Sequence, residues 1–260
     1  MTPGEPQPSR SPSSAPPLEV QRAFWNEWDT KYRERSLEDL EPDSIRRGRL
    51  ALRWTETLKL GSGATILEVG CANGWLCEHL VTFGAVTGTD IADEVIARAQ
   101  TRHPNIRFLA GDFSTLVLPA ASFDVVVCLE TLGCVANQPA FLAHIADLLK
   151  PGGHLILTTQ NRFVYERYDG VAPQNPGQLR HWLFWSELRR LLRPRYRILR
   201  HTTVAPASQR GMLRVVTSRK LDRILGPVIG AEHLDRVRET LGFGRSLAVL
   251  ARRESREERP

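Results

Sequence analysis

The spacing of apolar positions changes near residue 62 of this 260-residue chain. Residues 20–32 and 44–60 carry apolar side chains at helical spacings, which predicts two amphipathic helices. Beyond them, short apolar runs alternate with helical segments. Strands are predicted over residues 65–69, 85–89, 106–110, 123–129 and 154–159, and helices over 75–83, 92–101 and 138–149. This alternation predicts an α/β fold with a doubly wound, mostly parallel seven-stranded sheet.

The last third of the chain has a less regular pattern. An irregular stretch from Gln160 to Leu179 precedes a predicted helix over 185–192 and strands over 195–204 and 246–251. We therefore expect a Pro/Ser-rich disordered tail over 1–18, a helical cap over 19–60 and a core over 61–205. A helical insertion over 206–245, expected to be an acceptor-side lid, precedes the last strand and charged tail over 246–260.

Charge is distributed unevenly along the chain. The formal net charge is +6, but residues 178–260 carry 19 Lys and Arg against eight Asp and Glu. This excess fits either an acidic partner, such as a phosphorylated substrate or an acidic carrier protein, or a solvated surface. A nucleic-acid partner is not expected, because no nucleic-acid-binding motif accompanies the charge.

Location and metal content follow from what the sequence lacks. No apolar run approaches the roughly 20 residues of a membrane span, and the first residues lack the pattern of a secretory signal. We therefore expect a cytoplasmic protein. The four cysteines do not have zinc-knuckle spacing and are expected to be free thiols. No other cluster has ligand-like spacing, so no metal is expected.

A glycine-rich turn, Gly70-Cys-Ala-Asn-Gly74, follows the first predicted strand and opens a helix. Glycines let the backbone approach a ligand closely, and a helix N-terminus favours a carboxylate or phosphate. Asp90, at the end of the second strand, can accept hydrogen bonds from ribose hydroxyls. Nicotinamide enzymes share both features, so these two alone leave the cofactor undecided.

Three later motifs decide between the cofactors. Gly111-Asp112-Phe113 follows the third strand, Cys128-Leu-Glu-Thr-Leu132 follows the fourth, and Lys150-Pro-Gly-Gly153 closes a Leu-rich helix. With these motifs the sequence resembles the class I S-adenosylmethionine-dependent methyltransferases that act on small molecules. The resemblance is strong over residues 60–160 and implies a Rossmann-like fold.

The resemblance also implies a binding site for S-adenosyl-L-methionine. In it Asp112 would take the adenine amino group, and Phe113 would supply a backbone amide and an apolar wall. Ala72 stands where the family usually has a glycine. The expected cofactor residues are Glu68, Gly70, Cys71, Ala72, Gly74, Asp90, Ile91, Asp112, Phe113 and Leu129.

The acceptor side is expected to combine the N-terminal aromatic helix, the stretch after Gln160 and the insertion. Its expected residues are Tyr32, Asn161, Arg162, Tyr165, Arg180 and Arg210. His181, just before a helix, is the candidate general base. Glu130 is a second catalytic candidate, which either contacts cofactor or acceptor or caps the following helix.

The expected reaction is methyl transfer to a small-molecule or carrier-borne acceptor, at the oxygen of a sugar, glycan or secondary metabolite. Three alternatives stay open: a non-methylating, cyclase-like enzyme of the same fold, a nucleic-acid or protein methyltransferase, and a cofactor-binding scaffold. The base-methylating motif Asp/Asn-Pro-Pro-Tyr/Phe is absent after the fourth strand, where Cys128-Leu-Glu-Thr131 stands. The acceptor's identity and the oligomeric state stay open too.

Overall fold

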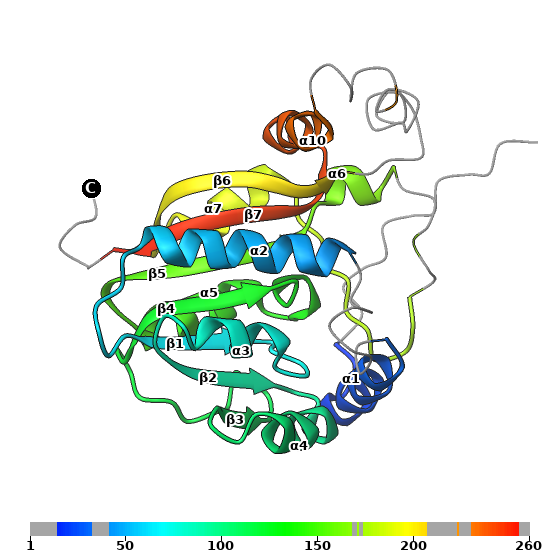
Figure 1. Cartoon of the computed structure of the whole chain (residues 1–260). Helices are drawn as coiled ribbons and strands as arrows, with labels where there is room; N and C mark the ends of the chain where they lie inside the picture. The colour runs from blue at the N-terminus through cyan, green and yellow to red at the C-terminus, as the bar shows by residue number, and fades with distance from the viewer. Residues whose placement is uncertain are drawn as a thin grey trace, which may run out of the picture.

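The computed structural model describes residues 15–32, 42–167, 171, 174–206, 223 and 230–254. Seven strands form one sheet in the order β3-β2-β1-β4-β5-β7-β6 (Figure 1). Their bounds are β1 Thr65–Val69, β2 Ala85–Asp90, β3 Arg107–Ala110, β4 Phe123–Leu129, β5 Leu149–Gln160, β6 Tyr196–Pro206 and β7 Gly244–Arg253.

Strands β1 to β5 are parallel to one another, whereas β7 runs antiparallel to both of its neighbours, β5 and β6. The predicted doubly wound, mostly parallel seven-stranded sheet is therefore confirmed. The chain order reverses beside β1, which pairs with β2 on one side and β4 on the other. Val69, the last residue of β1, lies beside Thr89 and Cys128. Ligands of such sheets bind at the carboxyl ends of the strands at this reversal.

Helices cover both faces of the sheet. Their bounds are α1 Leu18–Tyr32, α2 Pro42–Thr57, α3 Trp75–Leu80, α4 Asp93–Arg102, the 3-10 turn η2 Leu132–Cys134, α5 Gln138–Leu148, α6 Arg162–Tyr165, α7 Trp185–Leu192 and α10 Ala231–Thr240. One apolar core joins the sheet to α2, α3 and α4, and a second joins it to α5 and α7. In β1, Ile66 belongs to the first core and Leu67 to the second, because successive strand residues face opposite sides.

The two N-terminal helices lie apart rather than as one cap. α2 crosses one face of the sheet beside β4, β5 and β6, whereas α1 lies near the carboxyl end of the strands and packs against α4 (Figure 1). Strand β5 is also longer than predicted, because the Lys150-Pro-Gly-Gly153 segment belongs to it. The extra length is accommodated by a register shift against β4 between Phe123 and Val125.

Residues 1–14 of the tail predicted over 1–18, and most of the predicted insertion, lie outside the described residues. The longest described stretch of the insertion contains α10, which packs against β6. Among the described helices, none combines the length and apolar character that crossing a membrane requires.

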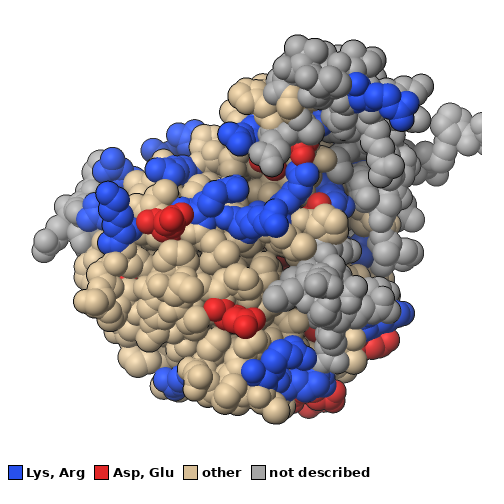
Figure 2. Space-filling model, viewed as in Figure 1, with Lys and Arg blue, Asp and Glu red and all other residues tan. Residues whose placement is uncertain are grey.

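Basic side chains form a band across one face, over α2 and the adjoining edge of the sheet (Figure 2). The band contains exposed arginines from α2 as well as from β6, namely Arg46, Arg49, Arg53, Arg197 and Arg200. The basic surface therefore draws on both ends of the chain rather than on the last third alone. Recruitment of an acidic partner stays a prediction.

Candidate cofactor and acceptor site

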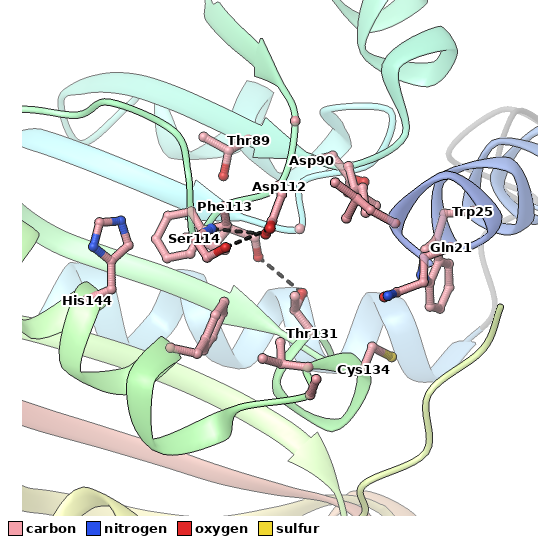
Figure 3. Close-up of a pocket in the computed structure, with 18 of the residues that line it drawn as sticks. Gln21, Trp25, Thr89, Asp90, Asp112, Phe113, Ser114, Thr131, Cys134 and His144 are labelled. Carbon is pink, nitrogen blue, oxygen red and sulfur yellow. Dashed lines mark hydrogen bonds between the residues drawn. The ribbon is translucent and has the colours of Figure 1, made fainter. Parts of the chain in front are cut away.

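A cavity of about 430 Å³ opens at the carboxyl ends of β1, β2 and β4, between α1 and α5 (Figure 3). It thus lies at the reversal of strand order. Seven residues expected from the sequence line it: Gly70, Asp90, Ile91, Asp112, Phe113, Leu129 and Glu130. Sequence motifs more than 50 residues apart therefore meet around one space.

The glycine turn after β1 forms the floor of the cavity at Gly70. This residue has a φ of 78°, and a Cβ added there would lie 2.0 Å from Thr131 Oγ1. The backbone nitrogens of Gly70 and Cys71 donate to the Thr89 carbonyl, at 2.7 and 3.0 Å. Only glycine fits this position, where the backbone itself borders the cavity.

Two carboxylates, Asp90 and Asp112, lie at the ends of β2 and β3. Asp90 Oδ2 accepts from the backbone nitrogen of Ala72 at 2.9 Å, and its Oδ1 accepts from that of Ala92 at 3.0 Å. Asp112 accepts from the backbone and hydroxyl of Ser114, at 3.0 and 2.6 Å (Figure 3). These bonds fix both carboxylates, and a carboxylate group can accept several hydrogen bonds at once.

An aromatic wall closes the far end of the cavity. The Phe113 ring meets Phe141 edge-on with centroids 5.2 Å apart, and it meets His144 at 4.9 Å. Phe141 and His144 belong to α5, and sequence analysis did not assign them to the site. Their helical spacing was an available signal, but it is also the spacing of ordinary core residues.

Four of the expected cofactor residues do not line the cavity: Glu68, Cys71, Ala72 and Gly74. Glu68 is buried and accepts a hydrogen bond from Cys77 Sγ at 2.9 Å. The reason is the period of two in β1, which places Glu68 on the Ile66 side of the sheet, under α3. The Glu68 side chain thus connects β1 to α3.

The other three residues shape the turn. Ala72 has a φ of 47°, a conformation that favours glycine and explains the family preference at this position. Gly74 lets α3 approach the sheet, since a Cβ there would lie 2.7 Å from the Phe108 ring.

The buried cysteines beside the turn have raised pKa values. Burial raises the pKa of Cys71 to about 11. The pKa of Cys77 is raised well above its usual value, first by its hydrogen bond with Cys71. All four cysteines are free thiols, as predicted.

Helix α1 covers the open side of the cavity. Leu18, Gln21, Trp25 and Asp29 recur every three or four residues and face inward (Figure 3). Sequence analysis predicted an amphipathic helix lying on the core but missed the polar members of its inner face. Gln21 and Asp29 could have been found only by asking which polar residues share that face with Trp25.

Polar contacts attach α1 to the start of α4. Asn26 Nδ2 donates to Asp93 Oδ1 at 2.8 Å, and Arg98 donates to Thr30 Oγ1 at 2.7 Å. The hydrogen bond from Asn26 lowers the pKa of Asp93 despite an opposing contribution from desolvation. All of these contacts are exposed, so they hold α1 weakly and reversibly.

Glu130, directly after β4, connects the cavity to α2. It has a φ of 61°, which is rare for a residue with a side chain. Its carboxylate Oε1 lies 3.9 Å from Arg47 Nε, and each of the two side chains is 11% exposed. Sequence analysis did not single out Arg47, because an arginine in a surface helix gives no signal that it points inward.

His181 lies just outside the cavity. Its Nδ1 is 2.9 Å from the carbonyl oxygen of Val135, a cavity residue, and its imidazole is exposed. A proton on Nδ1 would make this a hydrogen bond and leave the lone pair on Nε2. His181 therefore borders the site without lining it, and its role as a base stays a prediction.

The expected acceptor residues divide into two groups. Asn161 is buried and donates to the carbonyls of Gly242 and Gly244, at 3.1 and 2.8 Å, so it fixes the chain before β7. Arg162 is exposed and forms an ion pair with Glu166 at 2.7 Å. Both residues therefore have structural partners, and their role toward an acceptor stays a prediction.

Tyr165 and Arg180 form the second group, around Trp182. The Tyr165 and Trp182 ring centroids are 4.7 Å apart, and the Arg180 guanidinium lies 5.7 Å from the Trp182 ring. Burial lowers the pKa of Arg180. The cavity residue Cys134 acts in the opposite direction, through an electrostatic interaction that raises this pKa. None of the four described acceptor candidates, Asn161, Arg162, Tyr165 and Arg180, lines the cavity. Tyr165 and Arg180 lie close to it. Arg210 and the side chain of Tyr32 lie outside the described residues.

Within the part of the chain that the structure describes, no three His, Cys, Asp or Glu side chains are grouped so as to hold a metal ion. The cavity itself fits an adenosine-bearing ligand, because it combines a glycine floor, two fixed carboxylates and an aromatic wall.

Comparison with known proteins gives the family. A family model described as a methyltransferase domain matches residues 43–225. The ubiquinone biosynthesis O-methyltransferase of Coxiella burnetii is 34% identical over 116 residues, 43% of this chain and 50% of that enzyme. The phthiotriol/phenolphthiotriol dimycocerosates methyltransferase of Mycobacterium leprae is 38% identical over 99 residues, 36% of this chain and 37% of that enzyme.

The chain thus spans half or less of the length of these two relatives. Among solved structures, the N-methyltransferase NodS of Bradyrhizobium japonicum, in complex with S-adenosyl-L-homocysteine, superposes with a TM-score of 0.61. That match has 18% identity and covers 91% of this chain and all of NodS, so it shows a shared fold. The family model covers well over half of the sequence, and the chain therefore belongs to the class I S-adenosylmethionine-dependent methyltransferase family.

Proposed function

We propose that this protein binds S-adenosyl-L-methionine in the cavity beside β1 and transfers its methyl group to an oxygen of a small-molecule or carrier-borne acceptor. One observation carries the proposal: Gly70, Asp90 and Asp112 meet around one cavity at the reversal of strand order. Each is fixed there by the backbone or by a hydrogen bond.

The cofactor would lie along the line from the glycine turn to the aromatic wall. The Gly70 turn suits the methionine end, and Asp90 can accept from the ribose hydroxyls. Asp112 and Phe113 suit the adenine, through a carboxylate and an aromatic face. When bound, S-adenosylmethionine supplies a methyl group on a sulfonium sulfur, and the carbon–sulfur bond breaks with its electron pair remaining on sulfur.

The protein's own contribution is positioning and the exclusion of water. Leu18 and Trp25 of α1 cover the cavity, and Val135 and Cys134 border it beneath His181. Enclosure strengthens the polar contacts inside, and alignment of the acceptor behind the methyl group supplies much of the rate.

Oxygen is the proposed acceptor atom for two reasons. The Coxiella relative is named as an O-methyltransferase, and Glu130 offers a carboxylate at the cavity to take a hydroxyl proton. A sugar, a glycan or a secondary metabolite would supply such a hydroxyl.

The test has two arms. Titration calorimetry with S-adenosylhomocysteine should give a dissociation constant in the micromolar range, roughly 8 kcal/mol. Incubation with methyl-labelled cofactor and a clarified metabolite extract should give a labelled product by mass spectrometry. Folded protein that does not bind S-adenosylhomocysteine would contradict the cofactor assignment, and binding with only unlabelled new products would favour a non-methylating enzyme.

A further inference from the structure

The pairing of Glu130 with Arg47 bears on the kind of acceptor that this site takes. Glu130 lines the cavity, yet its Oε1 is buried and has no hydrogen-bond partner among the described residues. Arg47 Nε lies 3.9 Å from that oxygen, close enough for ionic attraction but too far for a hydrogen bond. A buried carboxylate oxygen in this state is costly unless a ligand donates to it.

The backbone holds Glu130 in this position against its conformational preference. Its nitrogen donates to the Thr158 carbonyl at 2.9 Å, and its carbonyl accepts from Gln160 Nε2 at 3.2 Å. Both partners belong to β5, so the carboxyl end of the neighbouring strand fixes the residue at a φ of 61°. A strained residue that is fixed so firmly at a cavity is a candidate functional group.

Arg47 is itself fixed from two sides. Its Nη2 donates to Ser44 Oγ at 2.9 Å and its Nη1 to Ser246 Oγ at 3.4 Å. These contacts come from α2 and β7, and they leave Nε directed at Glu130. The guanidinium therefore holds the buried Oε1 side of the carboxylate through charge, without donating a hydrogen bond to it.

We propose that Glu130 and Arg47 form the acceptor subsite for a hydroxyl group, with Glu130 as the catalytic base and Arg47 as its positioning residue. The acceptor hydroxyl donates its hydrogen bond to the Glu130 carboxylate, whose residue lines the cavity. As the acceptor oxygen forms its bond to the methyl carbon, its proton passes to this carboxylate, and the electron pair of the broken carbon–sulfur bond stays on sulfur. This inference rests on the proposed methyl transfer and specifies its acceptor group.

The first test needs no acceptor. Unfolding by denaturant is measured for the wild type, Arg47→Met, Glu130→Gln and the double variant. Each single change leaves the other charge buried without its partner, and the double change removes both charges. The unfolding constant of the double variant should therefore be at least fivefold smaller than the value expected from adding the two single effects in free energy. Additive effects would show that the two side chains are not coupled and would overturn the proposal.

The second test measures transfer of labelled methyl groups into the clarified metabolite extract. Glu130→Gln should lower the initial rate by at least a hundredfold and Arg47→Met by at least tenfold, whereas Arg47→Lys should recover part of the loss. The matched control is Arg46→Met, which removes an exposed arginine one position away that pairs with Asp235, and it should keep the wild-type rate.

Calorimetry with S-adenosylhomocysteine separates this inference from the proposed function. All five variants, the double variant included, should bind it within twofold of the wild type, because the pair serves the acceptor. If wild type binds it and labels a product while Glu130→Gln does so equally well, the inference fails and the proposed function stands. If the wild type neither binds it nor labels a product, the proposed function fails as well.

Discussion

Asp90 at the end of β2 holds the backbone nitrogen of Ala72 in the turn after β1, with a hydrogen bond of 2.9 Å. Its other oxygen holds the nitrogen of Ala92 at the start of α4. One carboxylate thus joins two strands and a helix at the border of the cavity, and the same group is proposed to bind ribose.

Asp90→Ala should therefore weaken S-adenosylhomocysteine binding through two effects, a lost ligand contact and a looser turn. We expect a loss of about 1–3 kcal/mol, or roughly 5- to 150-fold in the dissociation constant. Calorimetry measures it, and Glu78→Ala on the exposed side of α3 is the control. An unchanged dissociation constant in a folded Asp90→Ala variant would remove Asp90 from the cofactor site.

Ala72→Gly should stabilise the protein. Ala72 has a φ of 47°, which costs an alanine about 1–2 kcal/mol, and the greater freedom of glycine in the unfolded chain offsets roughly 0.5–1 kcal/mol of that. The net gain in unfolding free energy should be up to about 1 kcal/mol. Ala99→Gly, inside α4, should have the opposite sign. A loss of stability in Ala72→Gly would show that the methyl group contributes packing beyond its strain.

His181→Ala distinguishes the two candidate bases. The exposed imidazole of His181 borders the cavity without lining it. The turnover of this variant should therefore stay within about fivefold of the wild-type turnover. Loss of a general base would instead lower turnover by roughly 10²–10⁴-fold. Turnover is measured with labelled cofactor at saturating concentration. A hundredfold loss, with cofactor binding intact, would return the base to His181.

Asn26→Ala should loosen α1. It removes the bond to Asp93 and the bond that the backbone nitrogen of Glu94 donates to Asn26 at 3.2 Å. Because α1 covers the cavity, S-adenosylhomocysteine should dissociate a few times faster, as measured by stopped-flow displacement. Thr57→Ala at the end of α2, on the other side of the molecule, should leave this rate unchanged.

The attachment of α1 should also depend on pH. The pKa of Asp93 is lowered in the folded protein, so its stabilising contribution is complete above the ordinary carboxyl value of 3.8. It is lost as the pH falls through the lower, folded value. Protection factors of α1 amides in hydrogen exchange should therefore hold steady from pH 7 to about 4 and decline below it. In Asn26→Ala the folded pKa of Asp93 lies closer to the ordinary value, so the decline should be smaller.

The sheet could be predicted because its strands are nearly continuous apolar runs, and each of the five predicted core strands formed where expected. Cavity-lining positions in turns at strand ends, such as Gly70 and Asp112, could be predicted, since the fold brings such turns together. The motif position of Glu68 does not reveal which face of β1 this residue occupies, and its role toward the cofactor stays a prediction. Asn161 shows the same difficulty in a loop, where its partners are glycines about 80 residues away.

The acceptor side resisted prediction for a physical reason. Arg47 reaches Glu130 across 83 positions of sequence, and Asp29 faces the cavity from a helix whose attachment to α4 has no local signature. Such contacts depend on how each helix is placed on the sheet. The spacing of apolar residues predicts only which face of a helix is buried, not which polar contacts that face makes. Polar residues inside that stripe are the ones that sequence patterns assign least well.

The place of β7 between β5 and β6 has a consequence for the order of assembly during translation. The residues proposed to hold the cofactor all precede β5, so their cavity can form as soon as the parallel half of the sheet has left the ribosome. β6 joins the sheet only when β7 arrives, and Ser246 of β7 is one of the two hydroxyls that fix Arg47. A nascent chain could thus hold its methyl donor before it is able to use it.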